Sequence, residues 1–253
     1  MILPLLLLAA VQTETPKAGP PDPAEQRFDH CVDLAAGDPP SAETAAGQWL
    51  RDGGGFLAHQ CLGITYASEL RWTGAAIEFE AAAQGAEIAH DKRSANYWAQ
   101  AGNAWLATGE AMKARAALNA ALAGGTLVGL QRGEASLDRA RAFVASGDLA
   151  DARVDLDRAI VDAAGDPLAW LLSATLARRM KDVPRAQKDI AEAIHRAGDD
   201  ASVQLEAGNI AALAGDEAGA KAAWNRAVAI KPDGVAGRNA RNALKQFDTP
   251  AAK

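Results

Sequence analysis

The side chains best suited to chemistry are those of two cysteines, each with a histidine close to it. His30 directly precedes Cys31, and His59 stands two residues before Cys61. Thiolates and imidazoles are the usual ligands of structural zinc. On a helix, however, adjacent residues point about 100° apart, and residues two apart point about 200° apart. His59 and Cys61 would face opposite ways, so we expect no metal site here.

The other ionisable residues form no catalytic pattern. The two further histidines, His90 and His195, are far apart in the sequence. Glu78, Glu80 and Glu87 would lie around a helix, which is typical of surface charge. A catalytic site needs a nucleophile or acid with a partner that orients it, and we find no such set. We therefore expect no catalytic residue and no cofactor.

A run of three glycines at 53–55 is the remaining chemical candidate, because glycine-rich loops can hold phosphate groups. A phosphate-binding loop follows a strand and ends in Lys followed by Ser or Thr. Neither signal accompanies this run. We expect a flexible joint between two helices instead.

Composition favours closely packed helices over a sheet. Of 253 residues 49% are hydrophobic, with alanine abundant, but only 5% are aromatic. The formal net charge is −6, and no block of Lys or Arg stands out. Nucleic-acid-binding proteins carry a basic patch or stripe, so we expect no nucleic-acid partner.

The N-terminal segment has the pattern of an export signal. Residues 2–11 are apolar, too few to cross a bilayer core that needs about 20. We interpret residues 1–12 as a signal peptide with a cleavage point near Ala9 and Ala10, although it lacks a positive residue at its start. An uncleaved anchor is the alternative. Residues 13–23 form a proline-rich linker.

This leader predicts a periplasmic or secreted protein that touches the membrane at most through its N-terminus. No cysteine directly follows the apolar run, so the sequence has no lipoprotein signal.

The folded part is organised around a repeated unit, clearest at 201–234. Its first half carries small residues at helical spacing, a Gly-Asp turn breaks the chain, and its second half carries small residues around one tryptophan. A proline ends the unit. These residues are Ala207, Gly208, Ala211, Gly215, Asp216, Ala220, Trp224, Ala227 and Pro232.

Five copies of the unit occur in phase, and their pattern resembles the tetratricopeptide repeat, a helical hairpin of about 34 residues. The resemblance implies an all-α superhelix of about five to six hairpins. The copies span 56–89, 95–128, 133–166, 167–200 and 201–234, with longer connections at 87–94 and 124–129.

Two further segments complete the expected superhelix. Residues 24–55 read as a degenerate hairpin, whose second helix would begin after an N-cap at Ser41. Residues 235–248 read as a capping helix, with Val235, Ala240, Leu244 and Phe247 near helical spacing and directed at the last repeat.

The repeat frame also places the cysteines. Cys31 and Cys61 fall on the leading helices of neighbouring units, about one turn apart on facing sides. This placement predicts a disulfide, which export would favour; two buried free thiols are the alternative.

The resemblance implies that the leading helices line a concave groove, whose polar side chains bind a peptide. The groove residues would be Gln60, Asn96, Gln100, Asn103, Asp138, Arg141, Arg178 and Asn209, with Ile64, Thr175, Arg179 and Leu213 and an apolar contribution from Leu137, Leu168, Leu171 and Leu172. Some proteins with this repeat hold a peptide carboxylate with Lys and Asn four residues apart. Here Ala99 replaces that Lys while Asn103 is present, so the clamp is incomplete.

We therefore expect a non-catalytic scaffold that binds an extended segment of another protein, with a role in envelope assembly or secretion. Two alternatives stay open: a module that self-associates into homo-oligomers, and a helical enzyme acting on an envelope polymer.

Overall fold

The protein is built from helices alone over residues 22–247, the part of the chain that the computed structural model describes. The predicted all-α fold is confirmed there. The helices are α1 (Pro23–Gly37), α2 (Pro39–Arg51), α3 (Gly55–Ser68), α4 (Trp72–Ile88), α5 (Ser94–Ala107), α6 (Ala111–Ala123), α7 (Gly129–Ser146), α8 (Leu149–Asp162), α9 (Pro167–Arg179), α10 (Val183–Ala197), α11 (Ala201–Leu213), α12 (Glu217–Ile230) and α13 (Val235–Phe247). The predicted leader at 1–12 and most of the linker at 13–23 lie outside the described residues, as does residue 248.

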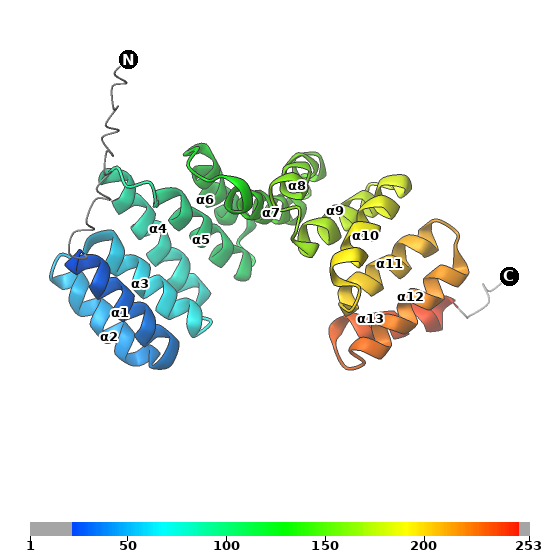
Figure 1. Ribbon diagram of the computed structural model, residues 1–253, viewed down its shortest axis with the longest axis horizontal. Helices are drawn as coiled ribbons and strands as arrows, with labels where there is room; N and C mark the ends of the chain where they lie inside the picture. The colour runs from blue at the N-terminus through cyan, green and yellow to red at the C-terminus, as the bar shows by residue number, and fades with distance from the viewer. Residues whose placement is uncertain (1–21, 248–253) are drawn as a thin grey trace, which may run out of the picture.

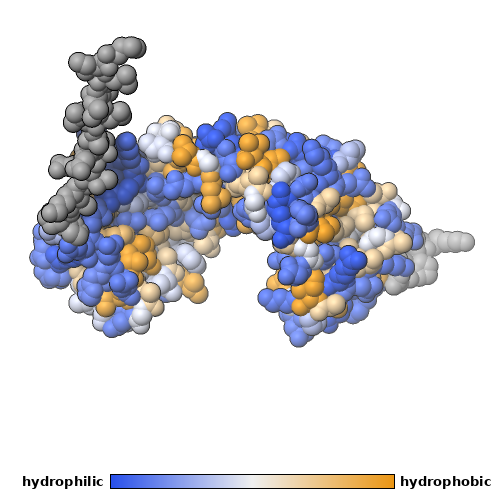
Figure 2. Space-filling model, in the orientation of Figure 1, coloured by the Kyte–Doolittle hydropathy of each residue, from blue (hydrophilic) through white to orange (hydrophobic). Residues whose placement is uncertain are grey.

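The helices pair in chain order into hairpins that stack as an arch. The hairpins are α1 with α2, α3 with α4, and so on to α11 with α12. Figure 1 shows α1–α4 at one end of the arch and α11–α13 at the other, with α6 and α8 on its outer side. The space-filling view shows the hollow that the arch encloses (Figure 2). None of the helices within 22–247 is long and apolar enough to span a membrane.

Aspartates begin many of the helices by accepting hydrogen bonds from free backbone N–H groups. Asp216 accepts from the N–H of Gly219 at 2.9 Å. The prediction of Ser41 as an N-cap is wrong. Helix α2 begins earlier, at Pro39, and Asp38 accepts from the N–H of Ser41 at 3.3 Å. Proline is tolerated in a first turn because its missing N–H would have no partner there.

The turn inside each of the five repeats uses the same backbone conformation. The fifteenth residue of each repeat has a positive φ: 59° at Leu70, 80° at Gly109, 85° at Gly147, 61° at Lys181 and 81° at Gly215. Glycine adopts this left-handed conformation without strain, whereas Leu and Lys do not. Gly37, which the sequence aligns with these residues, instead ends α1 without a positive φ.

Within a hairpin, a small residue of the leading helix admits a large one of the trailing helix. A Cβ on Gly63 would lie 2.6 Å from the ring of Phe79. Gly102 and Gly208 are covered in the same way by Leu118 and Trp224. The eighth residue of a repeat must therefore be small because the helices touch there.

The last helix closes the core. Ala240 is fully buried beside Trp224, and Leu244 packs against the same cluster. The prediction fails for Val235, which is 68% exposed because it begins the helix away from that contact.

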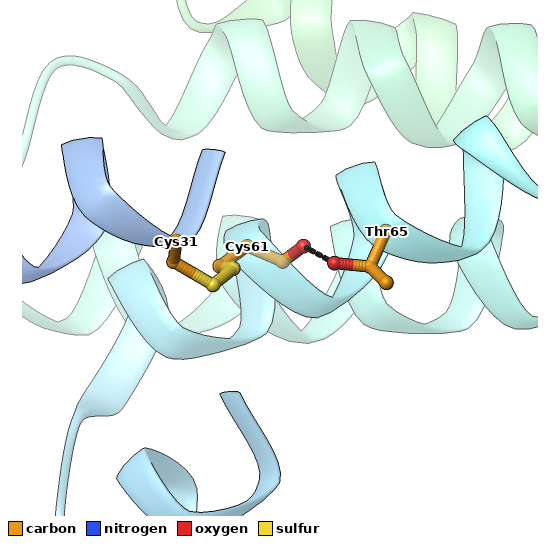
Figure 3. Close-up of a disulfide and its surroundings, with 3 residues drawn as sticks. All are labelled: Cys31, Cys61 and Thr65. Atoms are coloured by element: carbon orange, nitrogen blue, oxygen red, sulfur yellow. Dashed lines mark hydrogen bonds between the residues drawn. A yellow bond between two sulfur atoms is a disulfide. The ribbon is translucent and has the colours of Figure 1, made fainter. Parts of the chain in front are cut away.

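A disulfide joins the first hairpin to the second. The Sγ atoms of Cys31 on α1 and Cys61 on α3 are bonded, with their Cα atoms 6.1 Å apart (Figure 3). Both residues are buried, and the Thr65 hydroxyl donates to the Cys61 carbonyl at 2.9 Å. The predicted pairing is therefore present, and the described chain has no free cysteine.

The two histidines near these cysteines in the sequence, His30 and His59, make no hydrogen bond to the disulfide. His30 is exposed, and His59 Nδ1 lies 2.7 Å from the carboxylate of Glu78. No group of three potential metal ligands forms among residues 22–247.

Candidate binding groove

A cleft between two leading helices gathers most of the polar residues expected in the groove. Helices α5 and α7 enclose about 420 Å³. The polar side chains of the lining are amides and carboxylates without a cation, beside two alanines: Asn96, Gln100, Asn103, Gln131, Glu134 and Asp138. We refer to this space as the amide cleft. Asn103 donates its amide N–H to Asp138 at 2.8 Å, so one hydrogen bond spans the two helices.

Two amides of this cleft keep unused hydrogen-bonding capacity. The Oε1 atom of Gln100 is buried, yet it accepts no hydrogen bond from any described residue. Asn96 is half-buried beside it in the same cleft. A side-chain amide has both a donor and an acceptor. The cleft can therefore pair with the alternating N–H and C=O groups of an extended peptide.

A smaller apolar pocket lies between the next two leading helices. It encloses about 160 Å³ between α7 and α9, and its walls include Val144 and Leu172. Arg141 and Arg179 flank it. We refer to it as the apolar pocket. Its size suits one aliphatic side chain.

The two flanking arginines differ in their pairing. Arg141 donates to Asp138 at 2.8 Å and so connects the apolar pocket with the amide cleft. Arg179 is exposed and makes no hydrogen bond or ion pair with any described residue. Its guanidinium is free to pair with a carboxylate.

Arg178 and Asn209, two other predicted groove residues, are engaged within the protein. Arg178 donates to Glu206 at 2.6 and 3.2 Å, and Asn209 donates to the same carboxylate at 3.2 Å. Trp224 donates to Asn209 Oδ1 at 3.2 Å. This network links α9, α11 and α12, and it leaves both residues little capacity for a ligand.

The remaining predicted residues lie elsewhere. Gln60 is half-buried on α3 and lines neither the cleft nor the pocket. Leu137, expected in the groove, is 3% exposed and belongs to the core. Leu172 and Thr175, by contrast, do line the apolar pocket.

Three residues of this region escaped the sequence reasoning. Glu134 and Glu206 occupy the second and sixth positions of their repeats, which are groove positions, so the frame could have identified them. Gln131 could not be identified in this way. Helix α7 begins at Gly129, four residues before the repeat frame starts, because the long connection after α6 feeds directly into it.

Comparisons with known proteins bear on the fold. No family model matches the sequence, and no curated protein matches it significantly. Solved structures do match. PilF of Pseudomonas aeruginosa aligns with a TM-score of 0.69 and 16% identity over 87% of this chain and 99% of its own. PilW, described as a type IV pilus biogenesis factor, aligns with 0.70 and 18% over 87% and 98%. YrrB, described as a TPR protein with an unusual peptide-binding site, aligns with 0.60 and 18% over 79% and 96%.

Proposed function

We propose that the protein is an exported, non-catalytic adaptor. The proposal starts from its tetratricopeptide-repeat fold, which the sequence repeats predict and which is the fold of a protein–protein interaction scaffold. The adaptor binds an extended segment of a partner protein across α5, α7 and α9. The segment carries an aliphatic side chain with an acidic residue beside it.

One observation carries this proposal: the apolar pocket lies next to the amide cleft and is flanked by a free arginine. An aliphatic side chain of the partner fills the pocket, where its burial contributes about 1.5–3 kcal/mol. The Arg179 guanidinium pairs with the adjacent carboxylate. Gln100 and Asn96 then bind the peptide backbone as it crosses α5.

The location and the cellular role belong to the proposal as well. The apolar residues at 2–11 support export to the periplasm or the exterior, and the disulfide supports an oxidising compartment. PilW is described as a pilus biogenesis factor. A similar role in envelope assembly or secretion is the cellular function we assign.

The test selects peptides from a random library on the immobilised chain and measures their affinities by fluorescence anisotropy. We expect enrichment of an aliphatic residue with an acidic neighbour. Arg179→Gln should weaken binding of the selected peptides about tenfold or more, because it removes a charged hydrogen-bonding partner. Leu172→Asp should abolish binding by placing a charge in the apolar pocket.

The matched control is Arg226→Gln. Arg226 is an exposed arginine on α12 that, like Arg179, makes no hydrogen bond or ion pair with a described residue. Its replacement should leave the affinity unchanged. If the selected peptides bind the parent, Arg179→Gln and Leu172→Asp proteins equally, the groove is not the binding site and the proposal is wrong.

A further inference from the structure

A second cleft opens on the outer side of the arch, away from the groove. It lies between the trailing helices α6 and α8, encloses about 570 Å³ and has α7 as its floor. Figure 1 shows α6 and α8 along this outer edge, with α7 between them. Arg132, Ser136 and Arg139 of α7 line it, at i, i+4 and i+7. The amide cleft uses a different face of the same helix. We call this second space the outer cleft.

The outer cleft lies in a repeat that has a small residue where its neighbours have tryptophan. Ser136 is the fourth residue of its repeat, and the fourth residues of the repeats before and after it are Trp98 and Trp170. Trp98 reaches back to Glu87 in the preceding repeat at 2.7 Å, and Trp170 reaches back to the Ala164 carbonyl at 2.9 Å. The outer cleft lies beside the position that these two indoles occupy in the neighbouring repeats.

The outer cleft is lined by cations and contains no carboxylate. Arg132 binds Asp162 with two hydrogen bonds of 2.6 Å, and Arg139 binds Asp155 with two of 2.7 Å. Each pairing uses one edge of the guanidinium, which has five N–H donors in all. The third nitrogen of Arg139, Nη1, donates to the side-chain oxygen of Asn119 at 3.0 Å. Both arginines therefore keep N–H groups that no carboxylate occupies, although one of those on Arg139 is engaged by Asn119.

A third arginine in the outer cleft is unpaired. Arg158 of α8 is exposed and makes no hydrogen bond or ion pair with a described residue. The charge of Arg158 acts on Asp162, the same carboxylate that Arg132 binds. The pKa of Asp162 is lowered chiefly by its hydrogen bond to Arg132, and further by the charge of Arg158.

The floor of the outer cleft holds a polar group without a partner. The Ser136 side chain is 0% exposed, and its hydroxyl makes no hydrogen bond with any described residue. A buried hydroxyl without a partner destabilises a fold, and alanine in its place would avoid that loss. Its presence beside three arginines points to a ligand that accepts hydrogen bonds.

We propose that the outer cleft binds an acidic side chain of a second protein partner, with the carboxylate at Arg158, Arg139 and Ser136. Leu122 and Leu127, which also line the cleft, contact the aliphatic part of that side chain and its neighbours. The cleft is open to solvent, whereas small-molecule sites enclose most of their ligand. A protein side chain fits an open cleft better because the rest of the partner covers it.

The test uses end-blocked eight-residue peptides of alanine and leucine with one central Glu, and matched peptides with Gln. Binding to the ¹⁵N-labelled full chain is followed by NMR. We expect the Glu peptide to shift the backbone signals of Leu127 and Ser136 and the side-chain signal of Arg158, and the Gln peptide to leave them in place. Arg158→Gln should weaken this binding about tenfold, because it removes a charged partner but no hydrogen bond or ion pair within the described protein.

Two changes at the floor separate binding from folding. Ser136→Ala should weaken binding while the melting temperature stays equal or rises, because the hydroxyl has no partner to lose. Ser136→Trp should close the outer cleft, as Trp98 and Trp170 do in the neighbouring repeats, and abolish binding.

Two controls make the result specific. Arg226 stands at the same repeat position as Arg158, the twenty-sixth, and Arg226→Gln should change nothing. Arg179→Gln, which tests the groove, should also leave this binding unchanged, so the two sites can fail separately.

Several results would overturn the proposal. Equal shifts from the Glu and Gln peptides would show that charge is not recognised. Parent-like binding by both Arg158→Gln and Ser136→Trp would place the peptide elsewhere. Inorganic phosphate that shifts the same signals at a lower concentration than the Glu peptide would assign the cleft to a phosphate compound.

Discussion

Breaking the Cys31–Cys61 disulfide is expected to loosen the first hairpin and leave the rest of the arch intact. The bond closes a loop with a sequence separation of 30 residues. In the chain-entropy model, a loop of this length stabilises by about 3.6 kcal/mol. Helix α1 is also held to α3 by apolar packing, in which Phe28 contacts buried residues of α3, so the effect of reduction has this figure as its upper limit. The ion pair between Glu25 and Arg93 at 2.7 Å is solvent-exposed and contributes about 0–1 kcal/mol.

Stacked repeats contact only their neighbours, so this loss should stay local. Hydrogen exchange followed by mass spectrometry measures it helix by helix. In reductant, amides of α1 and α2 should exchange up to roughly 400-fold faster, which is the factor that corresponds to 3.6 kcal/mol. Amides of α9 and α10, several repeats away, should exchange at the same rate in both conditions.

The control is Cys31→Ala, which lacks the bond in every condition. Its exchange pattern should match that of the reduced parent and should not respond to reductant. Equal exchange at α1 and α2 in the oxidised and reduced parent would show that the disulfide does not stabilise this hairpin. Faster exchange along the whole chain would instead refute the assumption that the loss of stability is confined to the neighbouring repeats.

Two further predictions concern single residues. Lys181→Gly should stabilise the protein by about 0.5–1 kcal/mol, because a left-handed conformation strains Lys by about 1–2 kcal/mol and glycine loses part of that gain in chain entropy. Gly147→Ala, with its φ of 85°, should instead destabilise the protein by about 1 kcal/mol. Urea denaturation measures the free energy of unfolding of both variants, which should change with opposite signs. Burial raises the pKa of Tyr97 to about 12, whereas an unfolded tyrosine ionises near pH 10, so unfolding becomes easier as pH rises from 10 to 12. Tyr97→Phe should flatten that part of the stability curve and leave neutral-pH stability equal or higher, because the buried hydroxyl has no hydrogen-bond partner among the described residues; a fall in neutral-pH stability would contradict this reasoning.

The features that recur in every repeat could be predicted from the sequence. The small residue at Gly63, Gly102 and Gly208 and the large one sixteen positions later follow from the contact of two helices, which the structure contains. The stripe of Ala220, Trp224 and Ala227 is buried as its spacing predicts. Such positions are constrained by the fold itself, so five copies of one pattern suffice to identify them.

The side-chain partners that differ from repeat to repeat could not be predicted. Arg178 and Asn209 stand at groove positions, and only the structure shows that Glu206 engages both. Glu206 is 7% exposed, and nothing in the repeat pattern marks a buried carboxylate there. The start of α7 was equally hidden, because a connection of variable length precedes it.

The repeat at 133–166 departs most from its neighbours, and its departures lie on one helix. Helix α7 presents Asp138 to the groove and Ser136 to the outer cleft, so a partner on each side would contact the same rigid element. Arg139 occupies a position that is Ala in the repeats at 95 and 201, and its buried pair with Asp155 replaces apolar packing. A buried ion pair rarely stabilises more than apolar residues of similar size, which makes stability a weak reason for its presence. Arg139→Met together with Asp155→Leu, which puts apolar residues of similar size in place of the pair, should therefore leave the melting temperature nearly unchanged and abolish binding of the Glu peptide; a large fall in melting temperature would make the pair a requirement of folding instead.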